Sequence, residues 1–268
     1  MAVSRKRSQE GSEEERIVPG TPLWERQIEE HEQRYRFVAA RLRPGMSVLD
    51  AGCGAGYGAA LLADSGAAWV VAVDRSEPAL AIARAHFDRP RVTWLCEDCQ
   101  SLVEAGRHGL FALICNLENL EHLSDPDAFL DRASDLLEPG GTLITSTPNR
   151  IGVNRLRGLP PNSSSPNPYH VREYSSAELR ALLLAHFAEI SMHFQTLDPV
   201  ERMDVEAARA TAGQTPRARL GRLVRRIIGA RPAHAPERMR YQIVDADPGD
   251  ERVITQLAVC RSPRRGLA

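Results

Sequence analysis

The chain alternates short apolar runs with segments whose apolar residues recur at helical spacing. The run "LFALICN" is nearly continuous, which is typical of a strand buried on both faces of a sheet. The segment "SSAELRALLLAHF" opens with serines that can cap a helix and then places apolar residues three and four positions apart. The pattern predicts strands at residues 47–52, 68–74, 92–98, 110–116, 141–149, 188–195 and 253–260. It predicts helices at residues 57–66, 78–87, 127–137 and 175–187.

This alternation of strands and helices predicts an α/β fold with a doubly wound, mostly parallel, seven-stranded sheet. A core over residues 20–197 follows a disordered leader, 1–19, and residues 253–268 form the last strand and a tail. Between them, residues 198–252 are expected to form a helical insertion or cap. Within that insertion, residues 217–231 place apolar side chains on one helical face and arginines over the others. Such a helix can dock on the core, cap a site or contact an anionic surface.

Composition and charge narrow the class of protein. Of the 268 residues 43% are hydrophobic and 26% charged, as in ordinary soluble proteins, and no apolar stretch approaches the ~20 residues of a membrane span. The basic amino terminus lacks the apolar segment of a secretion signal. Five scattered cysteines predict free thiols and therefore a cytoplasmic protein. The net charge of −1 is not the basic field of a general nucleic-acid binder.

A glycine-rich loop, "VLDAGCGAGYG", follows the first predicted strand. Glycines such as Gly52, Gly54 and Gly56 let the backbone approach a ligand and expose the amides at a helix start. Dinucleotide-binding loops space their glycines G-x-G-x-x-G, so that a pyrophosphate settles at the helix terminus. Here the spacing is G-x-G-x-G and Asp50 precedes the loop. Because its carboxylate would repel a pyrophosphate, the loop better suits a ligand that carries an ammonium or sulfonium charge.

Acidic residues end the next two predicted strands. Asp74 ends the second strand, where a carboxylate can accept hydrogen bonds from both hydroxyls of a ribose. Alternatively Asp74 caps the following helix, although Ser76 is an equally good cap. Asp98 follows the third strand, where its carboxylate and the amide of Cys99 would fall beside an adenine.

These features, in this order, resemble the class I S-adenosylmethionine-dependent methyltransferases over residues 48–195. The motifs are "VLDAGCGAGYG", "VVAVD", "CEDCQSL", "LENLEHL" and "LLEPGGTLITSTPN". The resemblance implies a Rossmann-like sheet of order 3-2-1-4-5-7-6 with one antiparallel strand, and S-adenosylmethionine bound over the first two strands. It implies a lead-in helix that helps to close the pocket, where His31 and Tyr35 either serve the site or simply pack. The implied cofactor-binding residues are Asp50, Gly52, Gly54, Gly56, Asp74, Asp98, Cys99 and Asn116.

A second cluster of charged residues follows the fourth predicted strand. Glu118, Glu121 and His122 have the spacing i, i+3 and i+4, so on one turn of helix they would point the same way and could bind one cation. A metal ion there would lower the pKa of a coordinated hydroxyl and fix its position. The alternative is a charged first turn, with the glutamates at the positive end of the helix dipole.

The histidine of "NPYHVREYSSAELR" lies after the next strand end and strengthens the metal interpretation. E-x-x-E-H followed by H-x-x-E-aromatic resembles the small-RNA 3′-end 2′-O-methyltransferases, in which two glutamates and two histidines bind a divalent metal that holds a ribose diol. The resemblance implies Mg²⁺ or Mn²⁺ on Glu118, Glu121, His122 and His170. Without a metal, His122 or His170 would be the catalytic base. Ubiquinone-pathway O-methyltransferases, which act on catechols, share E-x-x-E-H.

The acceptor is indicated by resemblance alone. The lead-in segment, "TPNR" and "NPYHVREYSSAEL" are similar to bacterial methyltransferases associated with sugars, including polysaccharide O-methyltransferases. This implies a small-molecule or saccharide acceptor: a sugar hydroxyl of an oligosaccharide, a polysaccharide or a glycosylated metabolite. The alternatives are an RNA 3′-terminal ribose, a catechol or quinone, and a cofactor-binding module without catalysis. The near-neutral charge disfavours RNA, whereas the arginines of residues 217–231 favour it.

Overall fold

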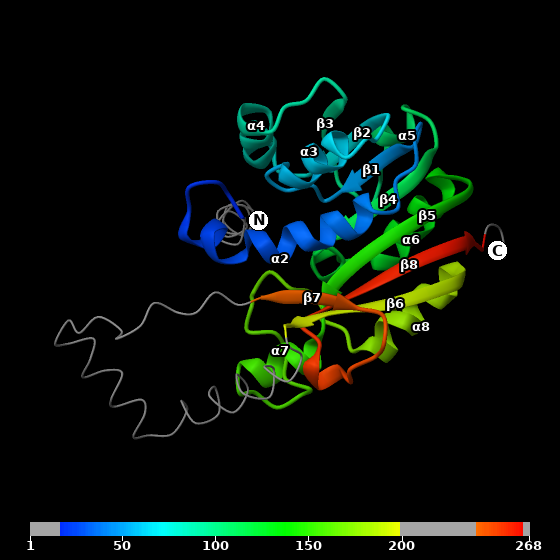
Figure 1. Ribbon diagram of the computed structural model, residues 1–268. Helices are drawn as coiled ribbons and strands as arrows, with labels where there is room; N and C mark the ends of the chain where they lie inside the picture. Colours follow the sequence, from blue (N-terminus) through cyan, green and yellow to red (C-terminus); the bar gives the residue numbers. More distant parts are fainter. Residues whose placement is uncertain (1–16, 199–239, 265–268) are drawn as a thin grey trace, which may run out of the picture.

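The computed structural model of the protein describes residues 17–198 and 240–264, which form one sheet with helices on both faces (Figure 1). The strands are β1 (Ser47–Ala51), β2 (Trp69–Asp74), β3 (Val92–Cys96), β4 (Phe111–Leu117), β5 (Leu137–Pro148), β6 (Phe187–Leu197), β7 (Tyr241–Val244) and β8 (Thr255–Pro263). The helices are α2 (Pro22–Ala39), α3 (Tyr57–Asp64), α4 (Glu77–His86), α5 (Val103–Gly106), α6 (Pro126–Leu136), α7 (Arg150–Leu156) and α8 (Ser176–His186). Two short 3-10 helices are η1 (Leu120–His122) and η2 (Asp250–Arg252). Within these ranges no helix is both long and apolar enough to cross a lipid bilayer.

The sheet has the strand order β3-β2-β1-β4-β5-β8-β6-β7. Strands β1 to β5 are parallel to one another, and β8 lies between β5 and β6 and is antiparallel to both. The predicted doubly wound, mostly parallel sheet is therefore confirmed, with β6 and β8 as its sixth and seventh strands. All five cysteines are free thiols, as the sequence also predicts.

An eighth strand, β7, lies within residues 198–252, the segment expected to form a helical insertion or cap. Strand β7 pairs antiparallel with the end of β6, from Phe194 opposite Val244 to Leu197 opposite Tyr241. The four-residue run is too short to stand out in the sequence, and it satisfies backbone groups that β6 would otherwise leave open at the sheet edge. The predicted helix over residues 217–231 and most of the predicted leader lie outside the described residues.

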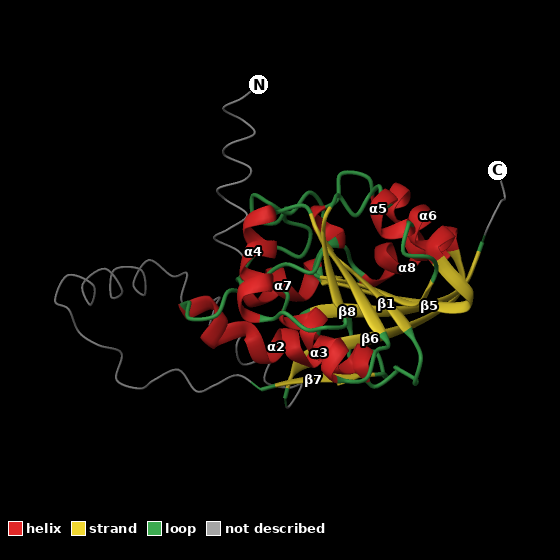
Figure 2. Ribbon diagram, turned by 90° about the horizontal axis from the view of Figure 1, so that it is seen from above, coloured by secondary structure: helices red, strands yellow, loops and turns green. Residues whose placement is uncertain are grey.

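The core lies on both faces of the sheet because side chains alternate along each strand. Leu49 and Val71 pack on one face and Val48 and Val70 on the other. Figure 2 shows α5, α6 and α8 on one side of the sheet and α2 and α3 on the opposite side. The continuous apolar runs of the central strands follow from this burial, since neither face meets water.

Side chains at the first helical turns explain where several helices begin. Ser175 and Glu178 form a reciprocal capping box at the start of α8, which confirms the predicted cap. Helix α7 is not predicted from the sequence, and the side-chain oxygen of Asn149 caps it by accepting from two backbone amides. Its Gly152 packs so closely that a Cβ would lie 1.8 Å from the carbonyl oxygen of Val253. This close packing fixes α7 beside η2 and the segment that leads into β8.

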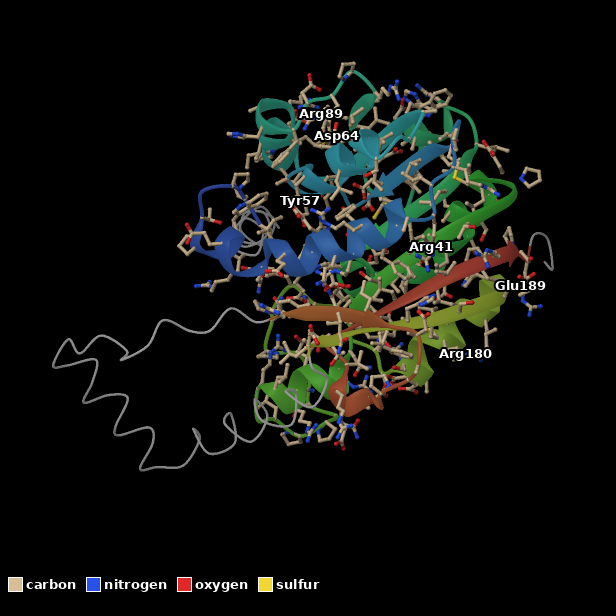
Figure 3. The ribbon with its side chains drawn as sticks, viewed as in Figure 1. Arg41, Tyr57, Asp64, Arg89, Arg180 and Glu189 are labelled. Carbon is tan, nitrogen blue, oxygen red and sulfur yellow. The ribbon has the colours of Figure 1, made fainter. Side chains whose placement is uncertain are left out.

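Helix α2 packs against both α3, which follows the glycine loop, and strand β6. The Tyr35 ring packs on Gly58 of α3, where a Cβ would lie 1.9 Å from a ring carbon. The Tyr57 hydroxyl lies 3.0 Å from His31 Nδ1, and Figure 3 shows Tyr57 beside α2. At the other side of α2, the buried Arg34 donates a hydrogen bond to Gln195 of β6. Helix α2 thereby forms one wall of the cavity at the carboxyl ends of the parallel strands.

Candidate active site

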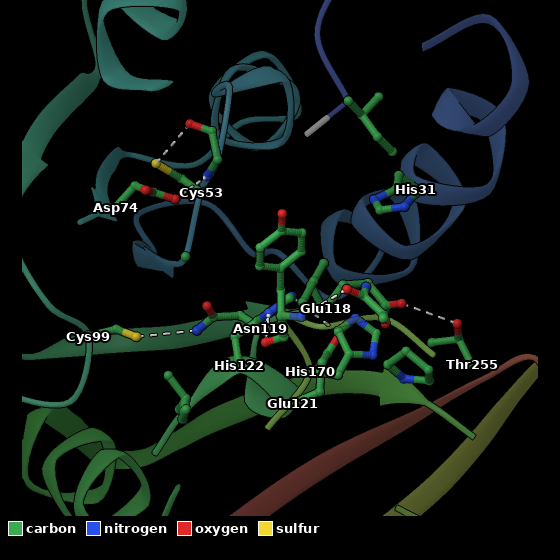
Figure 4. A pocket seen from close by; sticks show the side chains of 18 of the residues that line it. His31, Cys53, Asp74, Cys99, Glu118, Asn119, Glu121, His122, His170 and Thr255 are labelled. Carbon is green, nitrogen blue, oxygen red and sulfur yellow. Dashed lines mark hydrogen bonds and ion pairs between the residues drawn. The ribbon is translucent and has the colours of Figure 1, made fainter. Parts of the chain in front are cut away.

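A cavity of about 860 Å³ lies where β1 to β5 end, with α2 along its side (Figure 4). One part is lined by the loop after β1 and the ends of β2 and β3, and another by η1 and the loop before α8. In open α/β sheets ligands bind at this edge. Cavities of this size accommodate small organic ligands.

The glycine loop opens directly onto the cavity. Gly54 has φ +56°, a left-handed backbone conformation, and nothing lies within 4 Å of where its Cβ would be. Gly52, with φ +89°, also lines the cavity, but a Cβ there would lie 2.6 Å from the Asn119 side chain. Gly56 does not line the cavity and instead makes room for Ala83 and Trp94. The cavity wall is therefore formed by Gly52 and Gly54, whereas Gly56 has a packing role.

The Asp74 carboxylate is held by backbone amides at the rim of the loop. One oxygen accepts from Gly54 N at 2.9 Å and the other from Ser76 N at 2.8 Å. The cap of α4 is Ser76, whose hydroxyl accepts from Ala79 N. Asp74 is thus not the helix cap, and its side chain lines the cavity. A carboxylate fixed in this way can accept hydrogen bonds from the hydroxyls of a ribose.

Asp98 and Cys99 line the same part of the cavity. Asp98 Oδ1 accepts from Gln100 N at 2.9 Å, and Cys99 Sγ accepts from Asn119 Nδ2 at 3.2 Å. Asn116 is fully buried and does not line the cavity, because its Nδ2 donates to the carbonyl of Ala51 in the neighbouring strand. Asn119, which the sequence does not predict as a site residue, lines the cavity instead of Asn116.

Asp50 lies behind the glycine loop and not in the cavity wall. It is fully buried and accepts hydrogen bonds from the Tyr35 hydroxyl and the Cys115 thiol. Burial, which disfavours the charged form, raises its pKa to about 7. That Asp50 binds the cofactor stays a prediction. Its buried contacts with Tyr35 and Cys115 indicate that it contributes to the stability of the fold.

The pKa of Asp50 makes a testable prediction about stability. Because the folded pKa exceeds the usual value, the fold favours protonated Asp50, so this stabilisation is complete below about pH 4 and is lost as pH rises through 7. At about 1.4 kcal/mol per pKa unit, the loss is at most roughly 4 kcal/mol. We expect the free energy of unfolding, measured by urea titration, to fall less for Asp50→Asn than for the wild type as the pH rises from 5 to 8. Parallel curves for the two proteins would show that folding does not raise the pKa of Asp50.

Three predicted metal ligands converge at the other part of the cavity. The ligand atoms of Glu121, His122 and His170 all lie within 4.8 Å of one another. Glu121 is 1% exposed, and its Oε2 accepts from the Thr147 hydroxyl at 2.9 Å. Figure 4 shows the two imidazoles next to each other, on η1 and on the loop before α8. Residues 48 positions apart in the chain thus meet because both follow strand ends at one edge of the sheet.

Hydrogen bonds orient both imidazole rings. His122 Nδ1 lies 3.0 Å from the carbonyl oxygen of Tyr169, and His170 Nδ1 lies 2.7 Å from Glu173 Oε1. A carbonyl or carboxylate oxygen only accepts, so each Nδ1 carries a hydrogen and each neutral ring has its lone pair on Nε2. Histidine ligands of metals are typically held in this way.

Glu118 lies outside this three-residue set. Its carboxylate accepts from Ser146 Oγ at 2.8 Å and Thr255 Oγ1 at 3.4 Å, and it lies 3.9 Å from Arg34 Nη2. The three residues do not share one helical turn as expected. Glu121 and His122 lie on the 3-10 turn η1, whereas Glu118 follows the end of β4 at Leu117 and takes a left-handed φ of +50°. Glu118 lines the cavity, so it remains a predicted ligand beside the set of three.

The electrostatics of this cluster favour a cation. Burial and the nearby Glu118 carboxylate raise the pKa of Glu121 above its usual range. A buried acid of this kind is stabilised in its charged form by a positive partner, such as a bound metal ion. A carboxylate with two imidazoles suits Mn²⁺, Fe²⁺, Co²⁺ or Zn²⁺ as well as Mg²⁺. The donor set therefore fits a divalent ion.

The strand order, the glycine loop after β1 and the acid after β2 define a class of α/β proteins that bind a nucleoside-containing ligand at the sheet edge. A family described as "Methyltransferase domain" matches residues 23–186. The chain belongs to this family. The family assignment supports S-adenosylmethionine as the cofactor.

Known relatives agree with this assignment, and a solved structure shares the fold. The chain is 35% identical over 179 residues, 63% of its length, to a probable S-adenosylmethionine-dependent methyltransferase of Mycolicibacterium smegmatis. It is 39% identical over 108 residues, 40% of its length, to a ubiquinone biosynthesis O-methyltransferase of Dinoroseobacter shibae. The matches span 62% and 42% of those relatives. The fold is similar to N-methyltransferase NodS from Bradyrhizobium japonicum WM9 in complex with S-adenosyl-L-homocysteine, with a TM-score of 0.56, 17% identity and coverage of 96% and 99% of the two chains.

Proposed function

We propose that the protein is an S-adenosylmethionine-dependent O-methyltransferase that uses a divalent metal to methylate one hydroxyl of a sugar diol. The acceptor would be an oligosaccharide, a polysaccharide or a glycosylated metabolite. One observation carries the proposal: the cluster of Glu121, His122 and His170 opens into the same cavity as Gly54 and Asp74. A methyl donor and a metal-bound acceptor could therefore meet in one cavity.

The part of the cavity that is lined by the glycine loop and the ends of β2 and β3 suits S-adenosylmethionine. Asp74 offers a fixed carboxylate to the ribose hydroxyls, and the open face of Gly54 leaves room for the ligand beside it. Asp98 and Cys99 would lie beside the adenine. Relatives named as S-adenosylmethionine-dependent methyltransferases support this assignment.

The metal would be Mg²⁺ or Mn²⁺, held by Glu121, His122 and His170, with Glu118 as a further ligand. When bound, such an ion lowers the pKa of an alcohol and can hold two adjacent oxygens in place. Burial and the Glu118 carboxylate raise the pKa of Glu121, so a bound ion would also stabilise the charged form of this acid.

The chemical step is a substitution at carbon. The acceptor oxygen bonds to the methyl carbon, the carbon–sulfur bond breaks with its electron pair on sulfur, and S-adenosylhomocysteine leaves. With an ion bound, both Nε2 lone pairs would be used as metal ligands, and the hydroxyl proton would pass to water. Without an ion, Nε2 of His122 or of His170 would accept the proton as the base. Helix α2 and the loop before α8 hold the two substrates together, and positioning provides much of the rate in such a transfer.

Polar side chains around the cluster support a sugar acceptor. Gln27, Glu30, Arg157 and Asn167 line this side of the cavity and can bond to hydroxyl groups. The match to a ubiquinone biosynthesis O-methyltransferase instead favours a catechol or quinone acceptor, which also carries adjacent oxygens. RNA methylation stays a sequence-based prediction, because the arginine-rich residues 217–231 lie outside the described part of the chain.

The test is methyl transfer from labelled S-adenosylmethionine to chosen acceptors. After EDTA treatment and dialysis, we expect no turnover until Mn²⁺ or Mg²⁺ is added. A methyl glycoside with a vicinal diol should react, its deoxy analogue with one of the two hydroxyls removed should not, and a catechol provides the competing case. Unchanged turnover after EDTA would overturn the metal proposal, and S-adenosylmethionine binding without transfer to any acceptor would indicate a non-catalytic module.

A further inference from the structure

Glu173 is a buried acid next to the candidate metal cluster that the chemical step does not use. It is 4% exposed, and its Oε1 accepts from His170 Nδ1 at 2.7 Å and from the Ser165 hydroxyl at 2.6 Å. Arg157 Nη1 lies 3.8 Å from the same oxygen, while Oε2 is buried without a hydrogen-bond partner. Burying a carboxylate with one unsatisfied oxygen costs free energy. An arrangement of this kind is typical of a functional site rather than of ordinary packing.

The contact with His170 fixes how that imidazole is protonated. With Nδ1 donating to the carboxylate, Nε2 is the nitrogen that carries the lone pair. If Nε2 carried the hydrogen instead, the ring could not bind a metal or accept a proton through that atom. Carboxylates that hold a histidine ligand in this way also raise its basicity.

One loop holds both imidazoles of the cluster. Tyr169 contributes its carbonyl oxygen to His122, and Ser165 and Glu173 together hold His170. The loop is itself ordered by two local bonds, from Asn167 N to Ser165 Oγ and from Tyr169 N to Asn167 Oδ1. The proline- and serine-rich segment after α7 therefore arranges the site although it forms no regular element.

We propose that Glu173 is a positioning residue that holds His170 as its Nδ1–H tautomer and directs the Nε2 lone pair to the cluster. Its effect on metal binding rests on the proposed function, whereas its effect on the tautomer does not. A purely structural role would stabilise the loop without changing the tautomer of His170.

The test uses ¹⁵N NMR of the metal-free protein together with calorimetric titration of Mn²⁺. In the wild type, His170 should show a protonated Nδ1 and an unprotonated Nε2. In Glu173→Ala the ring should populate both tautomers, and Mn²⁺ should bind roughly 10- to 100-fold more weakly. Glu173→Gln keeps the shape but makes a weaker, uncharged bond, so its affinity should lie in between. Glu178→Gln, in the capping box five residues on, is the matched control and should leave both readings unchanged.

Two results would overturn the proposal. A wild-type His170 with its hydrogen on Nε2 would exclude it whether or not the protein binds metal. A wild-type tautomer and wild-type Mn²⁺ affinity in both Glu173 variants would give Glu173 a structural role only. If the wild type binds no Mn²⁺, the proposed function fails separately, and the tautomer of Glu173→Gln or Glu173→Ala still decides the role of Glu173. Should Glu173→Ala not fold, Glu173→Gln provides the comparison.

Discussion

Replacing His122 with alanine is expected to abolish metal-stimulated methyl transfer while leaving the affinity for S-adenosylmethionine within about twofold. His122 Nε2 lies 4.0 Å from Glu121 Oε1, and its Nδ1 is already engaged by the Tyr169 carbonyl. Altering a residue that only supports a ligand costs about 10- to 100-fold in metal affinity or activity. Loss of the ligand itself should therefore exceed about 100-fold in turnover with Mn²⁺. Initial rates and calorimetry on one preparation would measure both quantities.

His108→Ala is a matched control for this variant. His108 is an exposed histidine in the turn after α5, outside the cavity, so its removal should change neither quantity. Wild-type turnover in His122→Ala, at saturating acceptor and with added metal, would show that His122 is not a metal ligand needed for methyl transfer. A parallel loss of cofactor affinity would instead indicate that the cavity has collapsed.

Replacing Asp74 with alanine is expected to have the opposite signature. The carboxylate is held by the amides of Gly54 and Ser76, so it needs no rearrangement to receive the ribose hydroxyls. A hydrogen bond to a charged group contributes about 1.5–3 kcal/mol, so the loss of even one such bond should weaken S-adenosylmethionine binding about 10- to 100-fold. Mn²⁺ affinity should stay at the wild-type value, because Asp74 lies at the cofactor end of the cavity.

Asp64→Ala controls for the loss of an acidic side chain. Asp64 ends α3 and pairs with Arg89 on the surface, and Figure 3 shows the two side by side near α3. Its removal should leave both affinities unchanged. Unaltered S-adenosylmethionine binding in Asp74→Ala would mean that the ribose is held elsewhere in the cavity.

Most of the fold can be predicted from sequence because a parallel sheet buries both faces of its strands. The short continuous apolar runs of β1, β2 and β4 predict buried strands. Strand β7 escapes prediction because its four residues are defined by pairing with β6, a contact between residues distant in the chain. Helix α7 likewise depends on the close approach of Gly152 to Val253.

The site is predictable where a residue's place follows from the strand ends. Asp74, Asp98, Glu121, His122 and His170 all line the cavity, as the topology requires. Side-chain direction is harder to predict. The Asn116 side chain bonds to the neighbouring strand, and Asn119 lines the cavity only after Glu118 takes a left-handed φ. The support that Glu173 and Tyr169 give to the imidazoles depends on loop geometry, which no hydrophobic pattern encodes.

The central claim is that one divalent ion binds between Glu121, His122 and His170. Crystals grown with Mn²⁺ and S-adenosylhomocysteine, measured on both sides of the manganese absorption edge, would test it directly. We expect one anomalous peak bonded to Glu121 and to Nε2 of both histidines, in the same cavity as the sulfur of the cofactor product. Full cofactor density with no anomalous peak at these three side chains would contradict the claim.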